Sequence, residues 1–299
     1  MITPLMDNRS LDNKGLERLI EHILNGDVHG LFILGTTGEG PSLSYDLRVE
    51  LIERVFRQVD KRVPILVGIS DTAATDSHRL ADKAVAHGAY AVVATPPYYY
   101  PVDQSDMEAY FNYLSSRLDL PLFLYNMPSH TRVVLEPETV RNIAENENVI
   151  GLKDSSANFV YFQKLLHTMK DMPDFSLTVG PEEGLMQSIL AGANGGVNGG
   201  ANMFPNLYVK MYEAAVAKDF ERMIPLQKLI LRISARIYSI DRSGSAYLRG
   251  LKTALSLMGI CNDYMSEPLR QLEKRERATI DRNLKDLVKD LSSMNNHAT

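Results

Sequence analysis

Four segments of this sequence end an apolar run with side chains that can carry out covalent or acid–base chemistry. The chemical groups are the turn GTTGEG at residues 35–40, the tyrosines of PPYYYP at 96–101, Tyr125 and Lys153. Each preceding run is short and apolar, as expected of a buried strand. Polar groups at the ends of successive strands predict one site that is assembled from several strands.

Lys153 has the strongest chemical reason for its position. It follows the run VIGL inside a predicted buried strand, where an ammonium group is costly unless it is paired or neutral. Desolvation favours the neutral amine, which is the nucleophile that condenses with a ketone. The alternative is a structural ion pair with Asp154, which strand alternation disfavours because adjacent side chains point to opposite faces. We therefore expect Lys153 to form an imine with a ketone substrate.

The other three segments offer groups that could serve such an imine. The glycine-rich turn combines backbone N–H groups with the hydroxyls of Thr36 and Thr37, which can hold a carboxylate and relay a proton. Tyr125 and the tyrosines at 98–100 could act as acid–base groups. The structural alternatives are an ordinary strand–helix turn, tyrosine packing and a core tyrosine. No Gly-Lys-Ser/Thr sequence follows the turn, so it is not a Walker A loop.

Composition excludes several classes of function. The chain of 299 residues is 44% hydrophobic and 23% charged with a formal net charge of −5, which argues against nucleic-acid and anionic-membrane partners. No run of about 18 apolar residues predicts a membrane span, and MITPLMDNRS lacks the regions of a signal peptide. The single Cys261 suits a reducing, cytoplasmic compartment. The seven histidines show no metal-binding spacing, so no metal site is expected.

Strand-like runs alternate with amphipathic helical patterns through the first part of the chain. The expected strands are MITPL at the start and the runs at 30–35, 64–70, 89–95, 121–126, 149–154, 175–180 and 195–200. This alternation predicts an α/β fold, a (β/α)8 TIM barrel over residues 1–219, whose active site lies at the carboxyl ends of the strands. Residues 220–299 are expected to form a C-terminal helical layer, with helices at 220–240, 247–258 and 267–291.

Taken in order, the motifs resemble those of the dihydrodipicolinate synthase/N-acetylneuraminate lyase family of pyruvate-dependent (β/α)8 lyases. The resemblance covers nearly the whole chain and is carried by MITPL, GTTGEG, PPYYYP, YNMP, GLKDSS, a glycine with an acidic pair, and GANGG. It implies that Lys153 is the Schiff-base lysine and that Tyr125 shuttles the proton. It also implies that Thr37 and Tyr99 complete the relay, with Tyr99 reaching in from a neighbouring subunit.

The resemblance further implies how pyruvate is held. The amides and hydroxyls of Thr36 and Thr37 would grip its carboxylate, and Val197 would line the pyruvyl pocket. The imine would need no metal or organic cofactor, and the partners would be pyruvate and an aldehyde. Members of the family commonly form homotetramers built as dimers of dimers, which implies the same assembly here.

The aldehyde half of the substrate is less well defined by the motifs. In the synthase branch an arginine that grips a substrate carboxylate stands where this chain has His130, and Arg132 stands where the family usually has glycine. After the seventh strand, Gly180, Glu182 and Glu183 match a segment that binds polyol hydroxyls in the neuraminate-lyase branch. The alternative for the acidic pair is a favourable first turn of the next helix.

These residues favour a 2-keto-3-deoxy sugar-acid aldolase or a related hydroxy-2-oxo-acid lyase. The second hypothesis is a 4-hydroxy-tetrahydrodipicolinate synthase that condenses pyruvate with aspartate semialdehyde. The third, from a different class, is a non-catalytic barrel that senses a 2-oxo acid. Turnover of an aldol substrate would distinguish the enzymes from the sensor.

Overall fold

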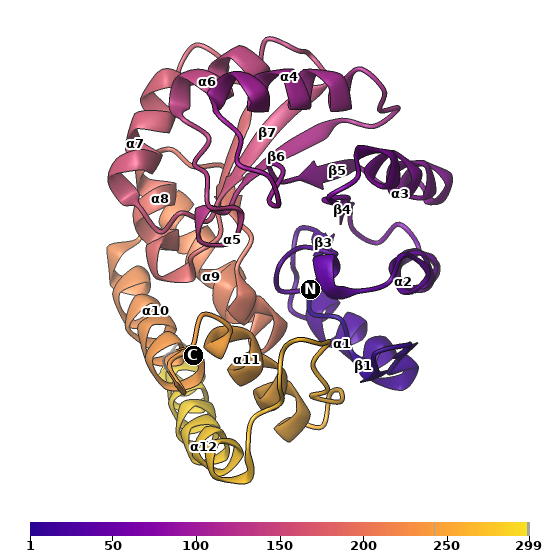
Figure 1. The fold of residues 1–299 in the computed structure, drawn as a ribbon. Coiled ribbons are helices and arrows are strands. Elements are labelled where there is room, and N and C mark those ends of the chain that lie inside the picture. Colours follow the sequence, from indigo (N-terminus) through magenta and orange to yellow (C-terminus); the bar gives the residue numbers. More distant parts are fainter. Residues whose placement is uncertain (242, 298–299) are drawn as a thin grey trace.

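The computed structural model describes residues 1–241 and 243–297, and its centre is a curled parallel sheet surrounded by helices (Figure 1). Seven strands follow one another in chain order across this sheet. They are β3 (Leu31–Ile33), β4 (Ile65–Gly68), β5 (Ala91–Ala94), β6 (Leu122–Asn126), β7 (Val149–Asp154), β8 (Ser176–Val179) and β9 (Gly195–Gly196). Sequential parallel strands with a helix between neighbours are the pattern of a (β/α)8 barrel. The predicted fold class is confirmed.

The helices of the outer layer form because each carries an apolar stripe that faces the sheet. In α2 (Tyr45–Val59), Leu47, Leu51 and Val55 are buried at four-residue spacing, and the Ser44 hydroxyl accepts from the Leu47 N–H at 3.3 Å. The others are α1 (Asn13–Leu24), α3 (Ala74–His87), α4 (Gln104–Ser115), α6 (Pro137–Ile143), α7 (Phe159–Thr168), α8 (Leu185–Ala191) and α9 (Pro205–Val216). Four short helical turns follow strands: η1 (Gly40–Ser42), α5 (Pro128–Thr131), η2 (Glu182–Gly184) and η3 (Gly199–Asn202).

The expectation that MITPL forms the first barrel strand is wrong. β1 (Leu5–Asp7) pairs antiparallel with β2 (Ser10–Leu11) in a separate hairpin. The preceding residues make single hydrogen bonds instead of a ladder: the Met1 nitrogen donates to the Phe32 carbonyl at 2.6 Å, and the Ile2 N–H donates to Asn202 Oδ1 at 2.9 Å. Pro4 has no N–H to extend a ladder. The segment therefore bridges β3 and η3 without becoming a strand.

The C-terminal helices pack together on one side of the barrel (Figure 1). α10 (Phe220–Ile233) continues into a π-helical turn, η4 (Ser234–Tyr238), and is followed by α11 (Ala246–Leu257) and α12 (Lys274–His297). The last helix begins later than the expected residue 267. α10 contacts η2 and α11 contacts η3, the turns that follow β8 and β9, so both helices reach the carboxyl end of the barrel. Buried apolar residues of these helices belong to the same hydrophobic cluster as the barrel core.

Candidate active site

Lys153 and Tyr125 lie side by side at the carboxyl ends of adjacent strands. They are register partners of the parallel pair β6–β7, which directs both side chains to the same face. The Lys153 Nζ lies 4.4 Å from the centre of the Tyr125 ring and 5.2 Å from that of Phe32. Both side chains are buried. The site thus places a primary amine against a phenol in an aromatic-walled pocket.

Asp154 is not the partner of Lys153. Its carboxylate points to the opposite face, where Asn126 Nδ2 donates to Oδ1 at 2.8 Å and the Ser156 hydroxyl donates to Oδ2 at 2.8 Å. Burial raises the pKa of Asp154, and these hydrogen bonds oppose that rise. In the part of the chain that the structure describes, no carboxylate lies within ion-pair distance of Lys153. The ion-pair alternative does not account for the buried amine.

The Tyr125 hydroxyl is linked to Thr36. The two hydroxyl oxygens are 3.1 Å apart. Burial by itself would raise the pKa of Tyr125, but the charge of Lys153 and hydrogen bonds with Thr36, Ser155 and Lys153 outweigh burial and lower it. A phenol with a lowered pKa gives up and regains its proton more readily. Thr37 was the expected relay residue, yet the hydroxyl that reaches Tyr125 is that of Thr36.

A small cavity beside Lys153 is lined by the residues expected to hold pyruvate. Thr36, Thr37, Gly38 and Val197 all line it together with Lys153. Among the described residues, the backbone N–H groups of 36–38 donate to no protein acceptor, so three donors remain free at its edge. Consecutive free N–H groups of this kind form an anion-binding concavity.

Val197 lines the cavity beside Lys153, whereas Gly180, expected to contact the substrate, lines neither cavity. Val197 packs against the cluster that contains Phe32 and Tyr125, and its N–H donates to the Val179 carbonyl at 2.8 Å. A Cβ on Gly180 would collide with the Ser155 hydroxyl and stand 3.2 Å from the Lys153 Cε. Glycine at 180 therefore leaves room for the lysine side chain.

A second cavity of about 220 Å³ adjoins the first and shares Phe32, Gly35 and Thr36 with it. Its apolar wall includes Leu34, Pro41, Val93 and Met127, and its polar groups come from Ser70, Thr95, Tyr98, Tyr125, His130 and Thr131. None of its lining residues is an aspartate, glutamate, lysine or arginine. Thr36 and Tyr125, the two hydroxyls that face each other, both border this cavity.

His130 is among the residues that line this second cavity. Its Nδ1 is 2.9 Å from the Ser129 hydroxyl oxygen. Partial burial lowers the pKa of His130 below its ordinary value of 6.5, so the ring is mostly neutral at pH 7. A neutral imidazole offers a hydrogen bond to a hydroxyl but no positive charge to a carboxylate.

Arg132 has a backbone conformation that explains the usual glycine at this position. Its φ of 62° lies in the left-handed region, where it ends α5. Glycine adopts this region at little cost, whereas a side chain with a Cβ is strained there. Arg132 is exposed and is not among the residues that line the second cavity.

The structure gives Glu182 and Glu183 other partners than a substrate. Glu182 is buried, and its carboxylate accepts hydrogen bonds from the Tyr208 hydroxyl, from the Tyr238 hydroxyl at 2.8 Å and from the Gly200 N–H at 2.9 Å. Glu183 accepts a hydrogen bond from the Ser234 hydroxyl. Neither lines either cavity. The acidic pair faces α9 and η4 rather than the barrel mouth.

Tyr99 lies outside both cavities of its own chain. Its side chain is 75% exposed, as is that of Tyr100, and the two rings meet edge to face with centres 5.0 Å apart. Tyr98 alone of the three tyrosines lines the second cavity. A role for Tyr99 at this site requires a second copy of the chain.

Two buried charged residues at the GTTGEG turn were not identified from the sequence. Glu39, in the GTTGEG turn, and Lys252, on α11, form a fully buried ion pair. Lys252 could have been found from the sequence, because it lies in the apolar stretch GLKTAL and, like Lys153, needs a partner or a neutral state if it is buried. Its partner Glu39 could not have been predicted from the sequence, because the two residues are 213 positions apart.

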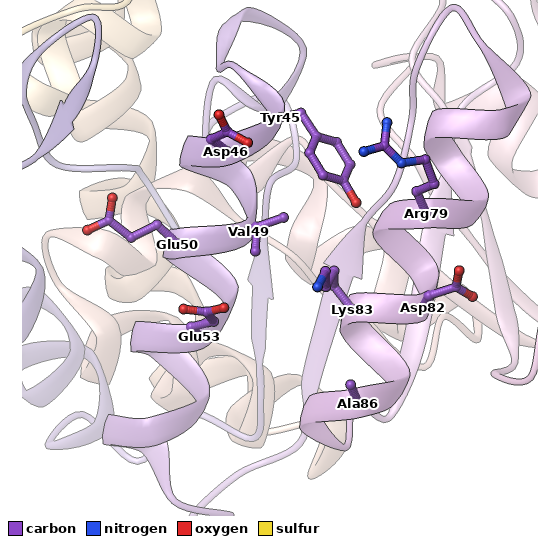
Figure 2. Close-up of a pocket in the computed structure, with 9 residues that line it drawn as sticks. All are labelled: Tyr45, Asp46, Val49, Glu50, Glu53, Arg79, Asp82, Lys83 and Ala86. Atoms are coloured by element: carbon purple, nitrogen blue, oxygen red, sulfur yellow. The ribbon is translucent and has the colours of Figure 1, made fainter.

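A separate hollow lies outside the barrel, between α2 and α3 (Figure 2). Acidic side chains of α2 and the basic Arg79 and Lys83 of α3 line it, and the Arg79 guanidinium stands 4.3 Å over the Tyr45 ring. It contains none of the residues around Lys153.

Among the described residues, no group of three or more His, Cys, Asp or Glu side chains is placed to hold a metal ion, and no helix is both long and apolar enough to cross a membrane.

Comparison with known proteins identifies the family. The model of the dihydrodipicolinate synthetase family matches residues 1–287. The chain belongs to this family. Its members are pyruvate-dependent class I aldolases and lyases, and the chain is an enzyme of this kind.

Relatives within the family carry different names. The chain is 29% identical to a 4-hydroxy-tetrahydrodipicolinate synthase of Staphylococcus carnosus, with 94% of this chain and 92% of the relative covered. It is 32% identical to the "Probable 2-dehydro-3-deoxy-D-pentonate aldolase YjhH" of Escherichia coli, with 90% and 88% covered. A solved dihydrodipicolinate synthase of Bacteroides thetaiotaomicron superposes with a TM-score of 0.93 at 54% identity over 96% of both chains. The family identifies the reaction class and leaves the aldehyde open.

Proposed function

We propose that this enzyme is a Schiff-base aldolase that cleaves or forms the C3–C4 bond of a 2-keto-3-deoxy sugar acid or a related hydroxy-2-oxo acid. The observation that carries the proposal is the position of Lys153. Its amine is buried beside Tyr125, without a carboxylate partner among the described residues, and shares a cavity with Thr36 and Thr37. A buried amine next to an acid–base group and an anion-binding turn is what imine formation with a 2-oxo acid requires.

The cleavage reaction follows from these groups. The neutral Lys153 amine adds to the 2-oxo carbon, and loss of water gives a cationic imine. The electrons of the C3–C4 bond move into the imine to give an enamine, while the C4 hydroxyl loses its proton and becomes the carbonyl of the released aldehyde. Protonation of the enamine at C3 and hydrolysis of the imine release pyruvate and free Lys153. Condensation is the reverse sequence, and neither direction needs a metal or an organic cofactor.

Proton transfer is assigned to the Tyr125–Thr36 pair. Tyr125 is close to the Lys153 amine, and its lowered pKa suits repeated exchange of a proton. Thr36 provides the next oxygen of the relay at 3.1 Å. We place Thr37 at the carboxylate of pyruvate, because it lines the Lys153 cavity and follows Thr36 in the turn with free N–H groups.

Tyr99 extends the relay from a second subunit in this proposal. The exposed Tyr99–Tyr100 pair leaves a large aromatic surface uncovered in a single chain. Thr36, which borders both cavities, is the residue that such a ring would have to reach to extend the relay. A homotetramer built as a dimer of dimers would bring the two features together.

The uncharged second cavity supports a hydroxyaldehyde as the other partner. Hydroxyls of Ser70, Thr95 and Tyr98 and the mostly neutral His130 can hydrogen-bond the hydroxyls of a sugar-derived aldehyde. A semialdehyde with its own carboxylate would find no cation among the residues that line this cavity. The proposal does not rest on Glu182 and Glu183, whose carboxylates have protein partners.

A second candidate is 4-hydroxy-tetrahydrodipicolinate synthase activity. It is favoured by the 54% identity to the structure from Bacteroides thetaiotaomicron, which is described as a dihydrodipicolinate synthase. Arg132, two positions after His130, would then have to turn toward the cavity to hold the second carboxylate. A panel of retro-aldol donors and of aldehyde acceptors with pyruvate separates the two: release of pyruvate from 2-keto-3-deoxy aldonates supports the aldolase, and preferential consumption of aspartate semialdehyde supports the synthase.

Borohydride trapping tests the shared first step. Incubation with pyruvate and reduction should add one pyruvyl-derived mass to the peptide that contains Lys153, and Lys153→Ala should show no adduct. An adduct that persists in Lys153→Ala, or no adduct in the wild-type enzyme, would contradict the imine assignment. Trapping without turnover of any aldol substrate would support the sensor hypothesis instead.

A further inference from the structure

We propose that Lys252, on the C-terminal layer, is a positioning residue that acts through Glu39 to hold the 36–38 turn in its carboxylate-binding form. The inference rests on the proposed function, because it concerns how the pyruvate carboxylate is bound. It predicts that a helix outside the barrel sets the affinity for the pyruvyl half of the substrate. Lys252 itself touches neither cavity.

The contacts form a closed network with no exposed member at its centre. Lys252 Nζ donates to Glu39 Oε1 at 2.5 Å and to the Tyr264 carbonyl at 2.6 Å. The other carboxylate oxygen, Oε2, accepts from both the N–H and the hydroxyl of Ser266, each at 2.7 Å. The side chains of Lys252 and Glu39 are both 0% exposed. The carboxylate is therefore fixed in position by three donors from two C-terminal segments.

A buried ion pair of this kind is not explained by stability alone. Removing two charges from water is costly, and an apolar pair of similar volume often stabilises a core equally well. What the pair does achieve is a connection between the GTTGEG turn and α11, which are distant in sequence. The pair is therefore best explained by the geometry that it imposes on the turn.

The backbone of the turn needs such a restraint. Glu39 has a φ of 55°, in the left-handed region that disfavours residues other than glycine. Its N–H donates to the Thr36 carbonyl at 3.0 Å, and the Thr3 hydroxyl donates to the Gly38 carbonyl at 2.6 Å. These bonds turn the carbonyls of residues 36 and 38 toward protein donors. The Gly35 carbonyl likewise accepts from the Gly40 N–H at 3.3 Å. The N–H groups of residues 36 and 37 point away from the bonded carbonyls of residues 35 and 36, on the other side of the same peptide planes, and are left free for an anion beside Lys153.

The test compares the variant Lys252→Met with a control variant, Lys285→Met, at an exposed lysine of the same layer. Lys285 on α12 forms an ion pair with Asp281 and is 68% exposed, so Lys285→Met makes the same chemical change in the same layer without reaching the turn. In the condensation direction with its best aldehyde, Lys252→Met should raise the KM for pyruvate by about tenfold or more, as expected when oriented hydrogen bonds to an anion are lost. The KM for the aldehyde should not change, and kcat should fall less than in Thr36→Val, because the Thr36 hydroxyl that faces Tyr125 is retained. Lys285→Met should match the wild-type enzyme.

Ser266→Ala keeps the test decisive if Lys252→Met does not fold. It removes one of the three donors to Glu39 and leaves the ion pair in place, so we expect a smaller rise, about threefold, in the pyruvate KM alone. An unchanged pyruvate KM in folded Lys252→Met, or in Ser266→Ala where the first variant fails to fold, overturns the inference. Equal rises in both KM values overturn it too, because a merely structural role would disturb both. Failure of the wild-type enzyme to form a pyruvate adduct would instead contradict the proposed function.

Discussion

Replacement of Glu182 by glutamine separates the structural role of this carboxyl from the substrate-binding role that the sequence suggested. Burial raises the pKa of Glu182 from 4.5 to about 7, although Tyr208, Gly200 and Tyr238 donate hydrogen bonds that oppose the rise. Each pKa unit is worth about 1.4 kcal/mol, so the folded state favours the protonated carboxyl by about 3 kcal/mol relative to the unfolded chain.

The direction of the pH effect follows from this raised pKa. The stabilisation from a protonated Glu182 is fully present below pH 4.5 and is lost as the pH rises through about 7. Glutamine cannot ionise, so Glu182→Gln lacks this loss. The difference in free energy of unfolding between variant and wild type should therefore move by about 3 kcal/mol in favour of the variant as the pH rises from 4.5 to above 7. The free energy of unfolding of Glu182→Gln should also be lower by an amount that does not depend on pH, because the amide N–H donors face the Gly200 N–H.

Urea unfolding at fixed protein concentration, followed by circular dichroism because the chain has no tryptophan, measures this difference. Tyr208→Phe provides a second arm: it removes a donor that lowers the pKa of Glu182, so the loss of stability should continue to higher pH than in the wild type. Parallel pH curves for Glu182→Gln and wild type would refute the reasoning. A tenfold or greater fall in aldolase activity with unchanged stability would restore Glu182 as a substrate ligand.

Three further predictions concern residues around the two cavities. Thr36→Val should lower kcat by about a hundredfold, as expected for loss of a relay group, whereas Thr37→Val should mainly raise the pyruvate KM; the same kinetic pattern in both would contradict the separate roles. Arg132→Gly should raise the free energy of unfolding by about 0.5–1 kcal/mol in urea, because it relieves the left-handed backbone at the cost of chain entropy; lower stability would mean that the arginine side chain makes contacts that outweigh this strain. Tyr99→Phe should slow turnover without changing the oligomeric state measured by sedimentation, and a fully active wild-type monomer would remove Tyr99 from the relay.

Local patterns in the sequence were sufficient to predict the fold class and to bring Lys153 and Tyr125 to one end of the barrel. Alternation of apolar runs with amphipathic helices predicts the barrel, because each strand of a covered parallel sheet must be apolar on both faces. A charged or hydroxyl-bearing residue at the end of such a run must then lie at the barrel mouth. This reasoning brings Lys153 and Tyr125 to the same end of adjacent strands, and the structure places them side by side.

Only the tertiary structure decided between neighbouring residues and between alternative partners. Whether Thr36 or Thr37 faces Tyr125 depends on the backbone of one turn, and that backbone is held by Glu39 and Lys252 from opposite ends of the chain. Glu182 likewise lies beside a substrate-binding segment in sequence, yet its partners lie 26 and 56 positions away, on α9 and η4. A buried carboxylate binds the donors that surround it in space. Periodicity and motif spacing carry no information about which distant segments supply those donors.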